Sequence, residues 1–170
     1  YGGTNSDYAF GIAVDGSGDI SITGQTMSSS GIATPGSFRT YVSGSYDGFL
    51  AKFDGAGAIQ WGTYYGGSSA DYGYGVATDA AGNIYIDGYT ASASTMTTTG
   101  AYQTVLDGVY DAYLAKFNSA GAIQWATYFG GDNADMGYGL AVTGAGDVYL
   151  TGYTYSTTSL ATTGAYQTVL

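Results

Sequence analysis

Residues 48–64 read GFLAKFDGAGAIQWGTY, and residues 112–128 read AYLAKFNSAGAIQWATY. The two stretches align without a gap at an offset of 64 residues, and each holds two apolar runs joined by a short Gly-containing segment. Short apolar runs on either side of a Gly-containing turn predict a β-hairpin. A hairpin that recurs at a fixed period indicates a repeat architecture rather than one ordinary domain.

The same offset relates the rest of the chain. The aromatic-Gly-Gly strings at residues 1–3, 65–67 and 129–131 coincide, and so do the isolated glycines Gly24, Gly88 and Gly152. We therefore divide the 170 residues into repeat 1 (1–64), repeat 2 (65–128) and a partial repeat 3 (129–170) with the first two strands and a long loop. Because the chain starts without Met and stops inside a repeat, we expect it to be an excerpt of a longer or processed protein.

Each full repeat is predicted to contain four strands. In the first repeat, residues 8–14 alternate large and small side chains, which is the period of a strand; the other strands are expected at 19–23, 48–53 and 58–64. The Ser/Thr/Gly-rich link over 27–46 is expected to be ordered, because in the later repeats its segment 98–104 recurs at 162–168 with the aromatic residue and the Gln preserved. With 30 Gly and no Glu, helix is improbable. We predict an all-β fold of tandem four-stranded antiparallel blade-like repeats of the β-propeller type, open or part of a larger ring or fibre.

Four strings carry a resemblance to a known family. They are YGYGVA (72–77), GNIYIDGYT (82–90), TTGAYQT (98–104) and DAYLAKFN (111–118). The chain resembles the bacterial SBBP repeats, which are named for a predicted seven-bladed propeller. The resemblance covers the whole chain and implies a secreted or surface-exposed bacterial protein. It implies no catalytic residues.

Composition excludes several classes of function. The chain has 13 acidic and three basic residues, a formal net charge of −10, and neither Cys nor His. Such a charge repels nucleic acid, and the missing side chains exclude thiol and imidazole catalysis and the usual zinc and haem ligand sets. No apolar run approaches the ~18 residues that a membrane span needs.

Calcium is one candidate ligand, at the turns that hold Asp15 with Asp19 and Asp79 with Asn83. Calcium prefers clustered oxygen ligands. However, repeat 3 has Thr143 at the first position, and side-chain bonds to the turn backbone account for an Asp there equally well. The Gly-Gly-x-x-x-Asp strings that end at Asp7, Asp71 and Asp135 lack the tighter spacing of calcium-binding β-rolls.

Tyrosines and lysines give two further candidates. Tyr85, Tyr89 and Tyr102 are candidates for a glycan platform, although rings repeated in this way more often pack between repeats. Lys52 and Lys116 lie between apolar strand residues. We expect each lysine to pair with a repeated aspartate, Asp47 or Asp111, while its aliphatic stem packs.

Evidence for an enzyme is thin. Two aspartates could meet as a glycosidase pair, but nearly all sit in predicted turns or recur like structural residues. Asp87 is the exception, because the aligned residues are Thr23 and Thr151. We assign no catalytic, cofactor-binding or metal-binding residue.

We therefore expect a non-enzymatic extracellular or cell-surface repeat protein, structural or adhesive, that builds a surface structure or filament through repeat-to-repeat packing. It would self-associate through open blade faces, or by completing the open sheet edge at Leu150–Thr154. One alternative is a closed propeller that binds glycan or peptide within a larger secreted protein; another is a propeller segment of a secreted hydrolase.

Overall fold

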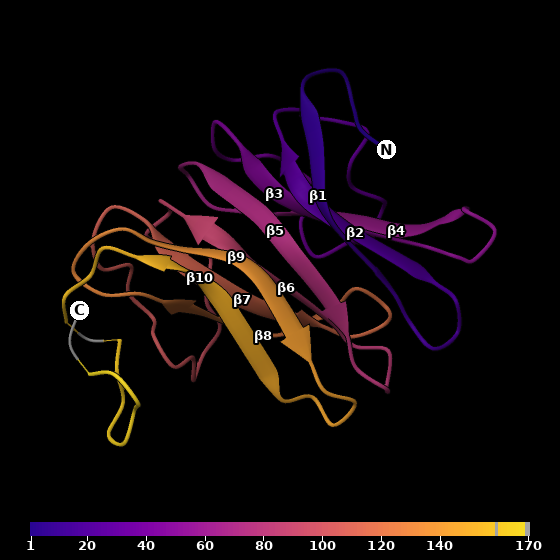
Figure 1. Cartoon of the computed structure of the whole chain (residues 1–170). Coiled ribbons are helices and arrows are strands. Elements are labelled where there is room, and N and C mark those ends of the chain that lie inside the picture. The colour runs from indigo at the N-terminus through magenta and orange to yellow at the C-terminus, as the bar shows by residue number, and fades with distance from the viewer. Residues whose placement is uncertain (159, 169–170) are drawn as a thin grey trace.

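The computed structural model describes residues 1–158 and 160–168, and these form ten strands in three antiparallel sheets (Figure 1). The strands are β1 (Asp7–Val14), β2 (Ile20–Thr26), β3 (Asp47–Phe53), β4 (Ile59–Tyr65), β5 (Asp71–Thr78), β6 (Ile84–Thr90), β7 (Asp111–Phe117), β8 (Ile123–Phe129), β9 (Asp135–Val142) and β10 (Val148–Thr154).

The predicted all-β blade architecture is confirmed. The first sheet has the order β1-β2-β3-β4, the second β5-β6-β7-β8, and the third holds the pair β9-β10. All neighbours are antiparallel, and the sheets are not closed into a ring. Of the predicted partial repeat 129–170, residues 159, 169 and 170 lie outside the described part of the chain.

The sheets follow one another along the chain like the blades of a fan (Figure 1). We call the first strand of each sheet (β1, β5 or β9) its inner strand, and the fourth strand of a full sheet its outer strand. The inner strands of the second and third sheets lie across the preceding sheet: β5 contacts β1, β2 and β3, and β9 contacts β5, β6 and β7. We call each of these contacts a joint. The core of the first joint combines side chains from both sheets, namely Leu50, Trp61, Tyr65, Ile84, Ile86, Tyr113, Ala115 and Phe117.

A β-bulge interrupts the inner strand of every sheet at the same place. The pairing of β1 with β2 skips Phe10, the pairing of β5 with β6 skips Tyr74, and that of β9 with β10 skips Tyr138. Only glycine fits opposite the bulge, because a Cβ added at Gly88 would lie 1.8 Å from the carbonyl oxygen of Tyr72. The recurring glycines at 24, 88 and 152 therefore report the bulge.

The aspartate that opens each inner strand ties two loops together. The Asp71 carboxylate accepts hydrogen bonds from the backbone amide of Gly67 (2.7 Å) and from the hydroxyls of Ser92 (3.0 Å) and Thr90. Asp7 makes the same three bonds in the first sheet. The Gly-Gly-x-x-x-Asp strings are thus loop-capping motifs.

The long link between the second and third strands is ordered, as predicted. It runs back along the outer strand, where the Thr34 amide donates to the Gly62 carbonyl (2.9 Å) and the Tyr64 amide donates to the Arg39 carbonyl (3.2 Å). The loop of the second sheet lies along β8 in the same way. These bonds protect the outer edges of both four-stranded sheets from pairing with other strands.

The bulge glycine gives a stability prediction. Gly88→Ala is expected to lower the free energy of unfolding by about 2–3 kcal/mol, because the methyl group collides with backbone that cannot move aside. Gly16→Ala is the matched control, since a Cβ there meets nothing within 4 Å. Urea unfolding followed by tryptophan fluorescence measures both; equal midpoints for the two variants would contradict this role of Gly88.

Candidate functional surfaces

Ten aromatic rings from the first two strands of the sheets and from neighbouring loops form a continuous cluster, which we call the aromatic ladder. Its members are Tyr8, Phe10, Tyr46, Tyr72, Tyr74, Tyr89, Tyr110, Tyr138, Tyr153 and Tyr155. The rings are half-buried or exposed, and Tyr155 is 68% exposed. The ladder therefore presents a polar-tipped aromatic surface across all three sheets.

The bulges place the central rings of the ladder. Phe10 stacks on Tyr74 with 4.9 Å between ring centroids, and Tyr138 meets Tyr74 edge-on at the same distance. Burial, followed by neighbouring phenols, raises the pKa of Tyr138 to about 12 and also raises that of Tyr89. These phenols stay neutral at physiological pH and can donate hydrogen bonds. Such a surface suits ligands with apolar faces and hydroxyl groups.

The three tyrosines predicted as a glycan platform do not come together. Tyr85 is buried: its ring packs against Trp125, and its hydroxyl donates to Asp79 at 3.0 Å. Tyr102 is exposed and packs beside Phe129. Of the three, only Tyr89 belongs to the ladder. The sequence signal for the ladder was the aromatic residue at aligned positions 10, 74 and 138, which alternation alone does not separate from core positions.

The predicted pairing of the lysines with Asp47 and Asp111 is wrong. The Lys52 ammonium lies 3.3 Å from an Asp15 oxygen and 2.9 Å from an Asp19 oxygen, and Lys116 lies 3.6 Å from Asp79. The strand register explains the difference. Lys52 pairs with Ser21, beside the turn between β1 and β2, whereas Asp47 pairs with Thr26 at the opposite end of the sheet.

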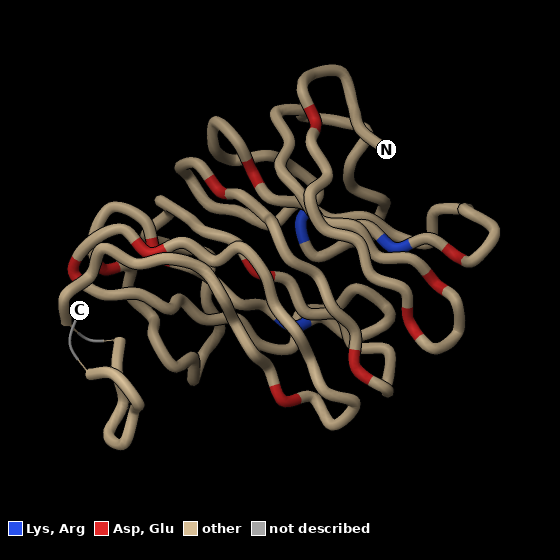
Figure 2. The backbone as a smooth tube through the Cα atoms, in the orientation of Figure 1, with Lys and Arg blue, Asp and Glu red and all other residues tan. Residues whose placement is uncertain are grey.

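The candidate calcium turn in the first repeat thus already holds a cation, the ammonium of Lys52. The Asp15 carboxylate also accepts the amides of Ser17 (2.9 Å) and Asp19 (3.0 Å), which is the turn chemistry weighed against calcium. Burial acts to raise the pKa of Asp15, but these amides and Lys52 outweigh it and lower the pKa. Figure 2 shows acidic residues gathered at both ends of the strands.

Asp47 and Asp111 cap the loop ahead of their strands. Asp47 accepts the amides of Ser43 (3.0 Å) and Gly44 (2.9 Å), while Asp111 accepts the amide of Asp107 (3.0 Å) and the side-chain amide of Gln103 (2.6 Å). Burial, and then the nearby charge of Asp135, raise the pKa of Asp111 to about 6 although these hydrogen bonds act to lower it.

One face of the first sheet is open. Ile12 is 69% exposed and Val14 is 61% exposed, whereas the aligned Val76 is partly buried in the first joint. The sheet edge predicted to be open at Leu150–Thr154 belongs to β10, which among the described residues pairs only with β9.

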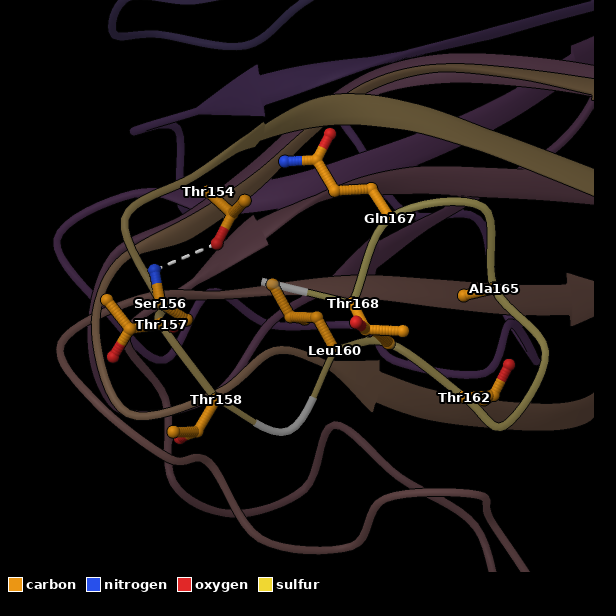
Figure 3. A pocket seen from close by; sticks show the side chains of 10 residues that line it. Thr154, Ser156, Thr157, Thr158, Leu160, Thr162, Ala165, Gln167 and Thr168 are labelled. Atoms are coloured by element: carbon orange, nitrogen blue, oxygen red, sulfur yellow. Dashed lines mark hydrogen bonds between the residues drawn. The ribbon is translucent and has the colours of Figure 1, made fainter. Parts of the chain in front are cut away.

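A hollow of about 450 Å³ lies between the end of β10 and the loop that follows it (Figure 3). Thr154, Leu160 and Thr168 are among the residues that line it, and none of the lining side chains is charged. In the first two sheets, the corresponding loop lies along an outer strand instead.

Comparison with known proteins agrees with this architecture. The sequence model of SBBP, a family described as a beta-propeller repeat, matches residues 60–94 and 124–158. The chain contains SBBP-type beta-propeller repeats. Each SBBP match runs from the outer strand of one sheet into the first two strands of the next, so it includes the crossing to the next sheet. A search of curated proteins found no match to the chain. No described part of this SBBP-repeat chain forms a helix that is long and apolar enough to cross a membrane.

The lysine pairs give a prediction with an internal control. Lys52→Met is expected to destabilise the fold by about 3 kcal/mol, because it leaves two partly buried carboxylates without their cation. Lys116→Met is expected to cost about 1 kcal/mol, since that ammonium is more exposed and makes one ion pair at 3.6 Å. Urea unfolding at neutral pH distinguishes the two; an equal or larger loss for Lys116→Met would contradict the assignment.

Proposed function

We propose that this chain belongs to a non-enzymatic extracellular structural or adhesive protein that builds a cell-surface structure or filament by packing repeat on repeat. The observation that supports the proposal most directly is the open face of the first sheet. It presents Ile12 and Val14 to solvent at the place where the second sheet uses Val76 to pack on its neighbour. Exposed apolar surface of this kind marks interaction sites.

The internal joints supply a template for association. In both, the inner strand of one sheet lies across the preceding sheet. The third sheet offers the next such surface, where Tyr149 is 63% exposed and Tyr153 is also exposed. A second copy would place β1 against β9 and β10, in a head-to-tail contact that can continue. The net charge of −10 opposes sideways clumping.

The aromatic ladder favours a second candidate function, a closed propeller that binds glycan or peptide within a larger secreted protein. The inner strands of a closed propeller surround its central channel, and five of the ten ladder rings lie on β1, β5 and β9. Its neutral phenols suit a neutral or cationic ligand, because the chain as a whole is strongly acidic.

Self-association through the open face is tested with a matched pair of variants. Ile12→Lys with Val14→Lys is expected to abolish concentration-dependent growth in mass, measured by light scattering after gel filtration. Val105→Lys with Val109→Lys makes the same change in charge at residues of similar exposure in the loop between β6 and β7, and is expected to leave the growth intact. A wild-type protein whose mass does not change with concentration would contradict the proposal, as would equal loss in both variants.

A further inference from the structure

Asp87 is a buried carboxylic acid at the joint between the second and third sheets. It lies in β6, is fully buried, and faces the inner strand β9. A Cβ added at Gly137 would lie 2.9 Å from one Asp87 oxygen, and a Cβ at Gly75 would lie 2.1 Å from the other. Two glycines thus make room for a side chain that stands between the sheets.

The first joint has a threonine in the same place. The Thr23 hydroxyl donates a hydrogen bond to the Phe49 carbonyl at 2.7 Å, and Gly73 packs against that hydroxyl. The residue aligned with Phe49 is Tyr113. Both oxygens of Asp87 are buried, and among the described residues neither has a hydrogen bond of normal geometry, although the amides of Gly75 and Gly139 lie near enough to favour the carboxylate. A threonine satisfies this position by donating a hydrogen bond, which an ionised aspartate cannot do.

No opposite charge compensates Asp87. Its own sheet presents Gly75 from β5 and Leu114 and Tyr113 from β7, while β9 presents Gly137 and Gly139. Tyr113 is the titratable neighbour, and its ring lies in the core of the first joint; its hydroxyl is buried without a partner among the described residues, and burial keeps its pKa well above the usual value. Among the described residues, no charged group contributes to the environment that sets the Asp87 pKa.

We propose that Asp87 is a proton-operated latch on the joint between the second and third sheets. The neutral carboxylic acid replaces the threonine hydroxyl and donates a hydrogen bond to the Tyr113 carbonyl on the neighbouring strand β7, so that no charge is buried against β9 and the joint stays closed. The carboxylate has no proton to give and carries an uncompensated buried charge, so ionisation loosens the contact of β9 with β6. The joint between the first and second sheets, with Thr23, has no such latch.

The direction of the pH effect follows from linkage. Burial raises the pKa of Asp87 from 3.8 to about 6, against the lowering effect of the Gly75 and Gly139 amides. Because the folded form holds the proton more tightly than the unfolded form, the stability contribution of Asp87 is complete below the unfolded pKa. It is lost as the pH rises through the folded pKa. Each pH unit between the unfolded and folded pKa values raises the unfolding equilibrium constant about tenfold, so the whole change is about a hundredfold.

The test compares the unfolding equilibrium of variants from about pH 4 to about pH 7. Asp87→Thr places the residue of the first joint at this position. Its unfolding equilibrium constant is expected to be about a hundredfold smaller than that of wild type at neutral pH, and equal to it in acid. Asp54→Asn is the control: it removes one charge, and the aligned Asn118 makes the same two turn bonds as Asp54. It is expected to leave the pH profile unchanged.

A reciprocal variant and a local readout separate a latch from a general charge effect. Thr23→Asp should install the same pH dependence at the first joint. Hydrogen exchange, corrected for intrinsic rates, should show that β9 loses protection with rising pH in wild type and keeps it in Asp87→Thr and Asp87→Asn. The proposal is overturned if Asp87→Thr keeps the wild-type pH profile, or if β9 protection does not depend on residue 87. These two outcomes decide the matter even if Thr23→Asp does not fold.

Discussion

Close approach of backbone at the joints is the constraint on which the rest of the structure depends. Gly73 of β5 lies over Gly24 of β2, and Gly137 of β9 lies over Gly88 of β6, with no space for a Cβ at either crossing. The crossing requires the glycine of the inner strand, and the bulge of the preceding sheet requires the glycine beneath it, so one local pattern sets the spacing of the blades. The bulge also turns an aromatic ring onto the inner strands, which makes the ladder a consequence of the same packing.

The few charged side chains stabilise local structure. The aspartates that open the first and third strands hold backbone amides of the loops ahead of them, and Lys52 joins the turn of one hairpin to the neighbouring strand. The side chain at position 39 differs between the repeats, although the surrounding backbone is arranged in the same way. The Arg39 guanidinium donates to the Gly66 carbonyl, whereas the aligned Gln103 receives the Gly130 amide (2.9 Å) and donates to Asp111. The scaffold accepts both because the backbone partners stay in place.

The repeat period, the four strands of each full repeat and the ordered long loop could be predicted from sequence, because each depends on local pattern and on alignment of the chain with itself. The ion pairs could not. The distance of Lys52 from Asp47 is set by strand register, which places them at opposite ends of a sheet. The aromatic ladder also escaped prediction, since the bulge shifts Phe10, Tyr74 and Tyr138 out of the alternation that residues 8–14 suggested. Asp87 could be recognised from the sequence because the residues aligned with it, Thr23 and Thr151, are threonines. Its burial between two sheets could not, because it depends on how the blades stack.

Electron microscopy of the purified protein, without imposed symmetry, tests the central claim most directly. If the open face of one sheet accepts the third sheet of another copy through the geometry of the internal joints, particles lengthen head to tail as the concentration rises. Their axial repeat then matches the stacking of blades within one chain. Isolated compact particles at every concentration, or closed discs of fixed size, would contradict head-to-tail assembly and would direct attention to the aromatic ladder.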